Sequence, residues 1–397
     1  METKETCLGD CILCNPAVKL TKGKIYPVID IDKITVGKKF VTNRDVVVYN
    51  GQGGAKFENG DTLMARITPC LENGKMAKAK IDGQGLGSTE LFVFRGKEGV
   101  TDNDYVYYLL KQQYIRNLAA NSMTGASGRQ RADLKYIKKI KLDIPSLEIQ
   151  RRIASILSAY DNLIENNNRR IRLLEQMAEN LYKEWFVRFP GHEKAEFENG
   201  LPKGWKYKRA DEVILFNPTL KVGKQTGYAI IPMEALSTSS MVLDSDCFEI
   251  KETISGRRSQ NGDTLFAKIT PCLENGKIGF VMGLPEGEVF GGSTEFIVLR
   301  SKTLSPYYVY CTARSYHFRQ TAILSMNGAD GRQRVDEDKL KSYKVVQPAK
   351  EDLEKLDRIV SPYFKQILHL TQENHSLSRQ RDLLLLRLMS GKLEVKV

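Results

Sequence analysis

The sequence predicts a mixed α/β protein made of two similar globular domains and two long helices. Residues 59–75 read NGDTLMARITPCLENGK and residues 261–277 read NGDTLFAKITPCLENGK, with fifteen of the seventeen positions identical at an offset of 202. Each copy is followed by a long, charged, Leu-rich segment almost free of Gly, at residues 148–188 and 351–389. A repeat of about 200 residues is too long for a solenoid unit, so we interpret the chain as a tandem duplication.

Length and composition agree with a soluble protein of two domains. The chain has 397 residues, of which 41% are hydrophobic, and it contains no apolar run long enough to span a membrane. The first residues lack the apolar stretch of a signal peptide, which predicts a cytoplasmic location and no membrane partner. The seven cysteines are therefore expected to be reduced. Cys7, Cys11 and Cys14 have a spacing similar to a zinc site, but no fourth Cys or His lies nearby, so we predict no metal.

The net charge of +12 is concentrated in the segments predicted to be globular. Residues 1–147 contain 23 basic and 16 acidic side chains, and residues 191–350 contain 22 and 19. An excess of positive charge favours a polyanionic partner, most simply nucleic acid. A protein that is merely basic remains the alternative.

Residues 1–147 are predicted to form the first domain, from short strands and one helix. Three runs of β-forming residues are separated by Gly-rich turns, at residues 25–31, 45–49 and 91–94. Apolar residues at helical spacing predict a single helix over residues 105–121. After a helix end at Pro190, residues 191–350 repeat this plan and form the second domain.

The segments 148–190 and 351–397 are predicted to be helical spacers that pair as a coiled coil. Apolar residues recur in both at alternating intervals of four and three, which is the spacing of a coiled-coil seam. The seam residues that we single out are Ile164, Asn167, Ile171, Leu174, Leu181, Ile367, Leu370, Asn374, Leu377 and Leu384. Pro362 predicts a break between a short helix over residues 351–360 and a longer one, with a similar bend near Ala159.

One Asn in each seam predicts how the two helices pair. A polar seam residue fixes register at some cost in stability. We therefore predict antiparallel packing with Asn167 facing Asn374, around a pseudo-two-fold axis that relates the two copies. The alternative is that residues 166–168, all Asn, are only a solvated break in the helix.

Two motifs in each domain contain candidate contacts to nucleic acid. GASGRQR at residues 125–131 and GADGRQR at residues 328–334 place two arginines around a glutamine, next to two glycines. Arginine binds phosphate or guanine and glutamine binds adenine, but a solvated surface loop is the alternative. The repeat ITPCLENGK ends in Lys75 or Lys277, which either contacts phosphate or belongs to a scaffold turn. The predicted DNA-binding residues are Arg129, Gln130, Arg131, Arg332, Gln333, Arg334, Lys75, Lys277, Lys56, Arg66, Lys268, Arg257 and Arg258.

Sequence motifs for catalysis are absent. The chain has no Walker phosphate loop, no Gly-x-Gly-x-x-Gly that opens a helix after a strand, and only four His, none matched between the copies. Residues 15–18 and 217–220 resemble the Asn-Pro-Pro-aromatic motif of amino-methyltransferases but lack its second Pro and its aromatic residue, and we interpret them as turns. We predict no catalytic residue and no cofactor in this chain.

The duplicated motifs resemble those of the specificity subunits of type I restriction–modification systems. They are two copies of GDTL-x-A-(R/K)-ITPCLENGK and of GSTE, each followed by a Pro and a long helix, together with ENLYKEWF at residues 179–186. The resemblance covers nearly the whole chain. It implies two target-recognition domains, each reading one half of a bipartite double-stranded DNA site, and helices that set the spacing between them.

The same resemblance implies the partners of the chain and a role in phage defence. Two methyltransferase subunits would dock on the helices, and restriction-translocase subunits would join them; S-adenosylmethionine, Mg and ATP would bind to these partners. We expect an asymmetric site with two unlike halves, because the copies diverge over residues 35–56 and 236–258.

Two other functions were weighed against this one. A self-sufficient restriction–methylation enzyme would need methyltransferase and nuclease motifs, which the sequence lacks. A tandem scaffold that binds only proteins would not need the excess of basic residues in the globular segments.

Overall fold

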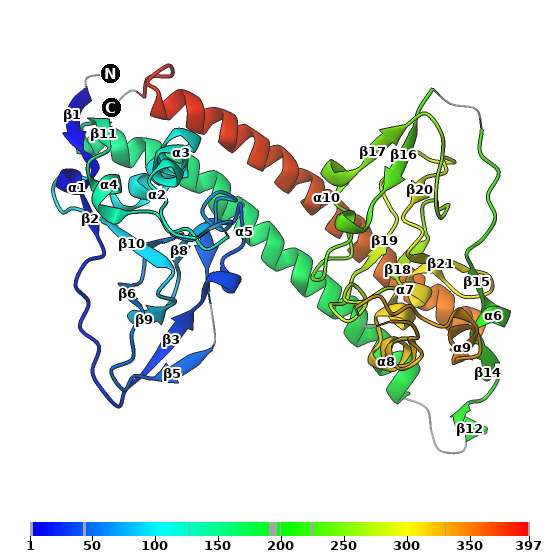
Figure 1. Ribbon diagram of the computed structural model, residues 1–397. Helices are drawn as coiled ribbons and strands as arrows, with labels where there is room; N and C mark the ends of the chain where they lie inside the picture. Colours follow the sequence, from blue (N-terminus) through cyan, green and yellow to red (C-terminus); the bar gives the residue numbers. More distant parts are fainter. Residues whose placement is uncertain are drawn as a thin grey trace. The chain divides into compact units, whose positions relative to one another are not determined.

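The chain forms two compact units that share two long helices (Figure 1). The computed structural model describes residues 3–42, 45–126, 128–189, 197–198, 200–223, 226–329 and 331–395. Unit 1 comprises residues 1–165 and 375–397, and unit 2 comprises residues 166–374. Each unit therefore takes one half of α5 (Leu147–Lys183) and one half of α10 (Lys350–Met389). The predicted mixed α/β class, with two domains and two long helices, is confirmed.

Unit 1 is built on a five-stranded and a four-stranded sheet. The first has the order β2 (Ile12–Cys14), β10 (Leu91–Gly96), β7 (Thr62–Ala65), β8 (Met76–Ala79) and β4 (Phe40–Val41). The second has the order β5 (Val46–Val48), β3 (Ile25–Ile29), β9 (Gln84–Gly87) and β6 (Ala55–Glu58). A ribbon pairs β1 (Thr3–Cys7) with β11 (Lys141–Pro145). Every side chain of β7 and β8 is buried, so the repeated GDTL motif lies in the core.

Two of the helices of unit 1 begin at an aspartate cap, Asp102 and Asp133, and the helical segment predicted from the sequence contains a break that its pattern does not reveal. The helices of this unit are α1 (Leu8–Cys11), α2 (Asn103–Lys111), α3 (Gln113–Asn121) and α4 (Leu134–Lys138). The single helix predicted over residues 105–121 is wrong, because Gln112 adopts an extended conformation (φ −62°, ψ 135°) between α2 and α3. Ser315 makes the same break in unit 2, where its side chain caps the next helix by accepting from the N–H of Phe318.

Unit 2 repeats this architecture with shorter sheets. A two-stranded ribbon pairs β14 (Lys206–Arg209) with β22 (Lys344–Gln347). One sheet has the order β15 (Ile214–Phe216), β21 (Phe296–Ser301), β18 (Thr264–Ala267) and β19 (Ile278–Phe280). The other sheet has the order β17 (Glu249–Lys251), β16 (Tyr228–Ile231) and β20 (Gly291–Gly292). A small ribbon pairs β12 (Phe197–Glu198) with β13 (Leu201–Pro202). The helices are α6 (Ala210–Val213), α7 (Pro306–Arg314), α8 (Tyr316–Leu324) and α9 (Glu337–Lys341).

Short helical turns complete the two units. They are Ile31–Lys33 in unit 1 and, in unit 2, Met233–Ala235, Ser245–Cys247 and the π-helical turn Glu184–Arg188, which extends α5. The predicted helix end at Pro190 lies outside the described residues. None of the helices in the described part of the chain combines the length and the apolar content that a membrane span requires.

The two long helices pair antiparallel. In unit 1 the first half of α5 packs with the second half of α10, and in unit 2 the second half of α5 packs with the first half of α10. In unit 2 the Asn167 amide donates to Glu373 (Nδ2–Oε2 2.8 Å), and the Asn374 amide donates to Asn168 (Nδ2–Oδ1 3.0 Å). The seam pattern predicts that Asn167 faces Asn374. Each of the two instead bonds to the residue next to the predicted partner, so the predicted register is wrong by one residue at these contacts. The Oδ1 atoms of Asn167 and Asn374 are buried and accept no hydrogen bond within the described residues, which is the cost of a polar seam.

The break predicted at Pro362 is wrong, whereas the matching bend near Ala159 stays a prediction. α10 continues through Pro362, and α5 runs without interruption from Leu147 to Lys183. Proline removes one backbone hydrogen bond and costs about 3 kcal/mol in a helix interior. Val360 and Phe364, on either side of Pro362, are fully buried in the core of unit 2. Burial of these side chains outweighs that cost and keeps the helix continuous.

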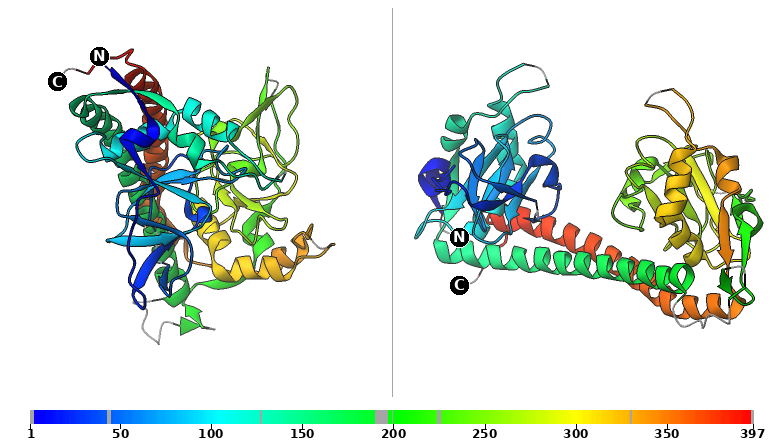
Figure 2. Two further views of the ribbon diagram at one scale, coloured as in Figure 1. Left: turned by 60° about the vertical axis from the view of Figure 1, so that its left-hand side comes forward. Right: turned by 90° about the horizontal axis from the view of Figure 1, so that it is seen from below.

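In each unit, half of α5 and half of α10 run along the globular part (Figure 2). The buried side chains between them differ at one equivalent place. In unit 1 a buried ion pair joins Arg381 to Asp161 (Nη1–Oδ1 2.5 Å), and the Tyr108 hydroxyl donates to the same carboxylate (2.5 Å). In unit 2 the positions that match Asp161 and Arg381 by the repeat are Phe364 and Ala178, and both belong to an apolar core. Both units hold the helices by apolar packing, and unit 1 adds a buried ion pair at a place where unit 2 has apolar side chains.

Candidate nucleic-acid interface

The RQR loops, residues 125–131 and 328–334, are hairpins with the same geometry in both units. Thr124 and Arg131 exchange two backbone hydrogen bonds (N–O 3.1 and 2.9 Å), and Asn327 and Arg334 exchange two more (both 2.9 Å). The second arginine of each motif therefore stands at the base of the hairpin. The rest of the loop projects beyond this base.

Each RQR loop is bound to the ITP turn of the repeated motif. In unit 1 the Thr68 N–H donates to the Gln130 carbonyl (3.0 Å), and the Gln130 N–H donates to Thr68 Oγ1 (3.2 Å). In unit 2 Thr270 and Gln333 form the same two bonds, each of 3.1 Å. These bonds use the glutamine backbone and leave its side-chain amide available. The two repeated motifs are thus one composite structure in each unit.

The second arginine of each loop already has a carboxylate partner. The Arg131 guanidinium binds Glu90 through three hydrogen bonds of 2.6–3.0 Å, and Arg334 binds Glu295 through three of 2.7–3.1 Å. Both carboxylates come from the GSTE motif. Hydrogen bonding to the arginine lowers the pKa of Glu90 and of Glu295 below the ordinary value of 4.5. Both arginines remain about half exposed, so one face of each guanidinium is open to solvent.

The first arginine of each loop is placed differently from the second. Arg129 and Arg332 are exposed, and neither forms an ion pair within the described residues. Lys75 and Lys277 point inward: their ammonium groups donate to the carbonyls of Ile31 (3.1 Å) and Met233 (3.0 Å). These bonds tie the ITPCLENGK turn to a short helical turn in each unit, which is the scaffold role weighed for both lysines.

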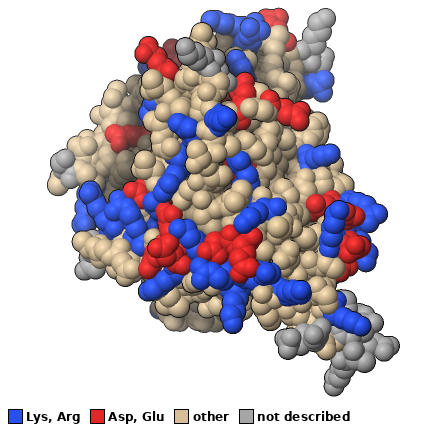
Figure 3. Space-filling model, turned by 90° about the vertical axis from the view of Figure 1, so that its right-hand side faces the viewer, with Lys and Arg blue, Asp and Glu red and all other residues tan. Residues whose placement is uncertain are grey.

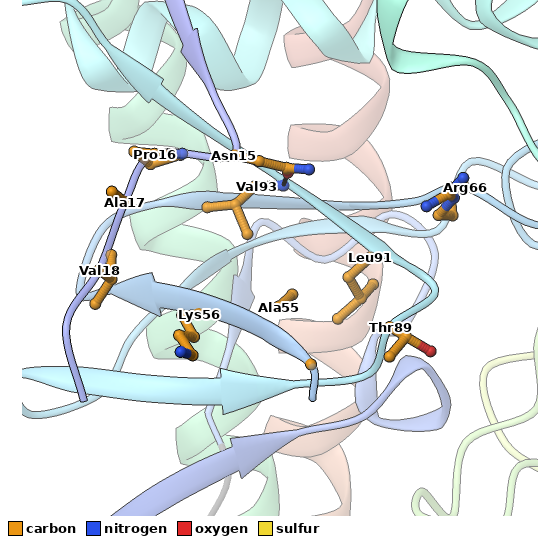
Figure 4. Close-up of a pocket in the computed structure, with 11 residues that line it drawn as sticks. Asn15, Pro16, Ala17, Val18, Ala55, Lys56, Arg66, Thr89, Leu91 and Val93 are labelled. Atoms are coloured by element: carbon orange, nitrogen blue, oxygen red, sulfur yellow. Dashed lines mark hydrogen bonds between the residues drawn. The ribbon is translucent and has the colours of Figure 1, made fainter. Parts of the chain in front are cut away.

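Lys56 and Arg66 line a cleft of about 520 Å³ in unit 1 (Figure 4). Arg66 and Thr89 lie at one end, Ala17 and Val18 lie at the other, and Leu91 lies between them. The Arg66 guanidinium carbon is 4.9 Å from the centre of the Phe92 ring, and the Lys56 ammonium is 5.1 Å from the centre of the Tyr49 ring. Such cation–π contacts orient the two side chains without neutralising their charge.

In unit 2 the residue equivalent to Arg66, Lys268, meets an acidic residue together with Arg257. Arg257 and Lys268 each lie 3.3 Å from Glu337 Oε1, and the Asn217 amide donates to Glu337 Oε2 (2.8 Å). Arg258 donates to the Leu220 carbonyl (2.7 Å). The structure therefore brings Arg257 and Lys268 together around one carboxylate.

Charges of both signs are interspersed on the face shown in Figure 3, where Lys and Arg side chains alternate with Asp and Glu side chains. The basic side chains on that face are not gathered into one continuous surface. The candidates instead form three sets within each unit: the exposed loop arginine, the loop arginine paired to GSTE, and the cluster around Arg66 or Lys268.

Several residues that hold these sets in place were not singled out from the sequence. Glu90 and Glu295 are part of the quoted GSTE motif, and their exact recurrence was the available signal for a structural role. The Asp of NGDTL is a second case: Asp61 binds Arg95 and Asp263 binds Arg300, each through two hydrogen bonds of 2.7 Å. Glu337 has no acidic counterpart in the first copy, so the repeat gave no signal for it.

Lowering the pH is expected to release Arg334 from Glu295 and weaken unit 2. The lowered pKa of Glu295 means that the pairing stabilises the folded state above the ordinary pKa of 4.5 and that this contribution is lost as the pH falls through the lowered value. We expect the difference in unfolding free energy between the wild type and Glu295→Gln to shrink between about pH 7 and pH 3. Urea unfolding followed by tryptophan fluorescence measures it, since Trp185 and Trp205 both lie in unit 2. A difference that stays constant over this range would contradict the pairing.

Comparison with known proteins identifies relatives with one shared description. A family model described as "Type I restriction modification DNA specificity domain" matches residues 12–176. The MjaIX specificity subunit of a type I restriction enzyme from Methanocaldococcus jannaschii is 25% identical over 330 residues, covering 76% of this chain and 71% of the relative. The MjaVIII specificity subunit of the same organism is 21% identical over 392 residues, covering 94% and 87%.

A solved structure has a similar fold. It is the S subunit of a type I restriction–modification system from M. genitalium, with a TM-score of 0.57 and 16% sequence identity over 98% of this chain and 96% of that chain. At this identity the likeness concerns the fold alone.

Proposed function

We infer that this chain belongs to the family of type I restriction–modification specificity subunits, and from that premise we propose that each of its units reads one half of a bipartite DNA site. The observation that carries the proposal is the RQR loop, which both units present in the same way. The ITP turn and GSTE hold the loop at its base, while Arg129 or Arg332 stays exposed. A loop that is fixed at its base and basic at its tip is suited to a DNA groove.

The side chains of the loop supply two kinds of DNA contact. An exposed arginine binds a phosphate or the O6 and N7 atoms of guanine, and the glutamine amide matches the N6 and N7 atoms of adenine. Because the loop sequences are nearly identical in the two units, they supply contacts that both half-sites share. Discrimination between the half-sites is assigned to residues 35–56 and 236–258, where the two copies differ.

The two long helices are proposed to set the distance between the half-sites. α5 has 37 residues and α10 has 40, which corresponds to lengths of roughly 55 and 60 Å at about 1.5 Å per residue. Half-sites read from one side of a duplex lie about 34–36 Å apart, or a multiple of that distance. Helices of this length are long enough to span such a separation.

Catalysis is assigned to partner subunits. We propose that two methyltransferase subunits dock on the helices, that restriction-translocase subunits complete the complex, and that S-adenosylmethionine, Mg and ATP bind to those partners. The chain would then work in the cytoplasm with DNA as its own ligand. A self-sufficient enzyme is the competing function, and it predicts methyl transfer by the purified chain mixed with S-adenosylmethionine and DNA.

Exchanging one recognition domain tests the proposal directly. Residues 1–147 are replaced by the corresponding segment of another specificity subunit, and the variant is expressed with its methyltransferase subunits. Methylome sequencing is expected to show a new sequence in one half-site and an unchanged sequence in the other. The matched control replaces residues 191–350 and is expected to change only the second half-site. A change in both halves after either exchange would contradict the assignment of one half-site to each unit.

A further inference from the structure

The two units differ in charge at one equivalent place. The repeat matches Lys56 to Arg258 and Arg66 to Lys268, so the basic character of both positions is kept. It also matches Leu134 to Glu337, which are the first residues of α4 and α9 and follow the capping residues Asp133 and Asp336. Unit 2 therefore has a carboxylate where unit 1 has an aliphatic side chain.

In unit 2 this carboxylate completes a closed cluster. Glu337 accepts from Asn217 and lies within ion-pair distance of Arg257 and Lys268. The Lys268 and Glu337 side chains are 15% and 24% exposed, so the cluster is partly shielded from solvent. The nearby positive charges also help to lower the pKa of Glu295, after the larger effect of Arg334. Positive charge at this place in unit 2 is neutralised by the protein itself.

In unit 1 the matching place keeps Arg66 but has Ala55 where unit 2 has Arg257, and it opens into a cleft with Lys56 beside Val18 at its other end (Figure 4). Within the described residues, no carboxylate forms an ion pair with Arg66 or Lys56, and the Arg66 Nε atom has no hydrogen-bond partner. The charge of Arg66 is therefore not paired by an acidic side chain in the described part of the chain, and an anion in the cleft would be attracted to it. The cleft also offers the Thr89 hydroxyl beside Arg66 and an apolar wall that includes Leu91 (Figure 4).

We propose that the cleft of unit 1 binds the DNA backbone, with Arg66 at one end and Lys56 at the other each facing a phosphate (Figure 4), and that Glu337 takes the place of the phosphate at Arg66 in unit 2. This inference rests on the proposed function. The cleft volume of about 520 Å³ lies within the range of about 300–1,000 Å³ typical of sites for small ligands. It therefore has room for a phosphate and its attached sugar, with the sugar against the apolar wall. The two recognition domains then contribute unequally to the electrostatic part of DNA binding.

The dependence of DNA binding on salt tests this inference with exchanged residues. In a plot of the logarithm of the DNA-binding constant against the logarithm of the salt concentration, each phosphate that the protein neutralises makes the negative slope steeper by about 0.9. Leu134→Glu places the acidic residue of unit 2 into unit 1 and is expected to reduce the steepness by about one. Glu337→Gln removes the charge from unit 2 and is expected to increase it by about one. Leu134→Gln is the control of similar size and is expected to leave the slope unchanged.

The measurement uses the full chain and a mixed-sequence DNA duplex, with binding followed by fluorescence anisotropy at several NaCl concentrations. Lys56→Gln is a second variant that places no charge in the core, and it is also expected to reduce the steepness by about one. Slopes equal to the wild type for both Leu134→Glu and Lys56→Gln would overturn the assignment. If the wild type itself fails to bind duplex DNA, the proposed function falls instead.

A free anion is the other source of the same chemistry. Inorganic phosphate is titrated against the DNA complex at constant ionic strength, with sulfate as the comparison. If the cleft binds a phosphate of DNA, free phosphate is expected to displace DNA no better than sulfate does. The displacement by phosphate is then expected to be the same for the wild type and for Lys56→Gln. Saturable competition by phosphate that Lys56→Gln abolishes would assign the cleft to a free phosphate and overturn the DNA contact.

Discussion

Replacing Arg381 by alanine is expected to destabilise unit 1 by about 3–5 kcal/mol, because it leaves the Asp161 carboxylate buried without its cation. The two side chains are only 4% and 3% exposed. Asp161 would keep the Tyr108 hydroxyl as a donor, but a single neutral hydrogen bond does not replace an ion pair in the core. The Asp382 carboxylate, which also binds Arg381, keeps Lys111 as a partner (Nζ–Oδ1 3.2 Å).

Hydrogen exchange measures this loss where it occurs. Peptides that cover α2 and the last turns of α10 are expected to lose protection in Arg381→Ala, while tryptophan fluorescence, which reports on unit 2, changes little. The matched control is the double variant Asp161→Leu/Arg381→Leu. It is expected to recover most of the stability, because apolar residues that replace a whole buried pair are often neutral or better. If the single and double variants lose equal protection from hydrogen exchange, the unpaired Asp161 carboxylate is not the cause of the loss of stability in Arg381→Ala.

Gly256→Ala is expected to destabilise unit 2 by about 2–5 kcal/mol, through backbone strain and overpacking together. Gly256 has φ +73°, and a Cβ atom there would lie 1.7 Å from the carbonyl oxygen of Gly292. The neighbouring Arg257 N–H donates to that same oxygen (3.0 Å), so movement of either strand disturbs the contact. Gly54 approaches Gly87 in the same way in unit 1.

Gly287→Ala separates the two causes. Gly287 has nearly the same φ, +77°, but an added Cβ would meet nothing within 4 Å. This variant is expected to cost only about 1–2 kcal/mol, from the left-handed conformation alone. Urea unfolding followed by tryptophan fluorescence compares the two variants in the same unit. Equal losses would show that the approach to Gly292 does not matter.

The architecture was predictable because it leaves periodic traces in the sequence. The duplication indicated two domains, and the four-and-three spacing indicated two long helices. One Asn in each seam indicated an antiparallel register close to the one observed. The RQR loops were identified as exposed candidates, and their first arginines are exposed. Their role in DNA binding stays a prediction.

The features that could not be predicted depend on tertiary contacts. Nothing in the local pattern shows that Gln112 interrupts a helix, because apolar spacing continues through it. Pro362 is a helix breaker by propensity, and only the burial of Val360 and Phe364 overrides it. Lys75 and Lys277 are typical surface residues by type, yet carbonyl groups 44 residues away in sequence take up their ammonium groups. A hydrogen-bond partner that is so distant in sequence cannot be predicted from the residues next to the lysine.

The division of each long helix between two units has a consequence for folding during synthesis. Unit 2 is one uninterrupted stretch, residues 166–374, whereas unit 1 needs residues 375–397 in addition to its first 165. A ribosome makes the chain from the amino end, so the domain whose synthesis starts first is also the last to receive all its parts. Until residues 375–397 have been made, Asp161 lacks its partner Arg381 and unit 1 cannot complete its fold, whereas unit 2 already has all its residues.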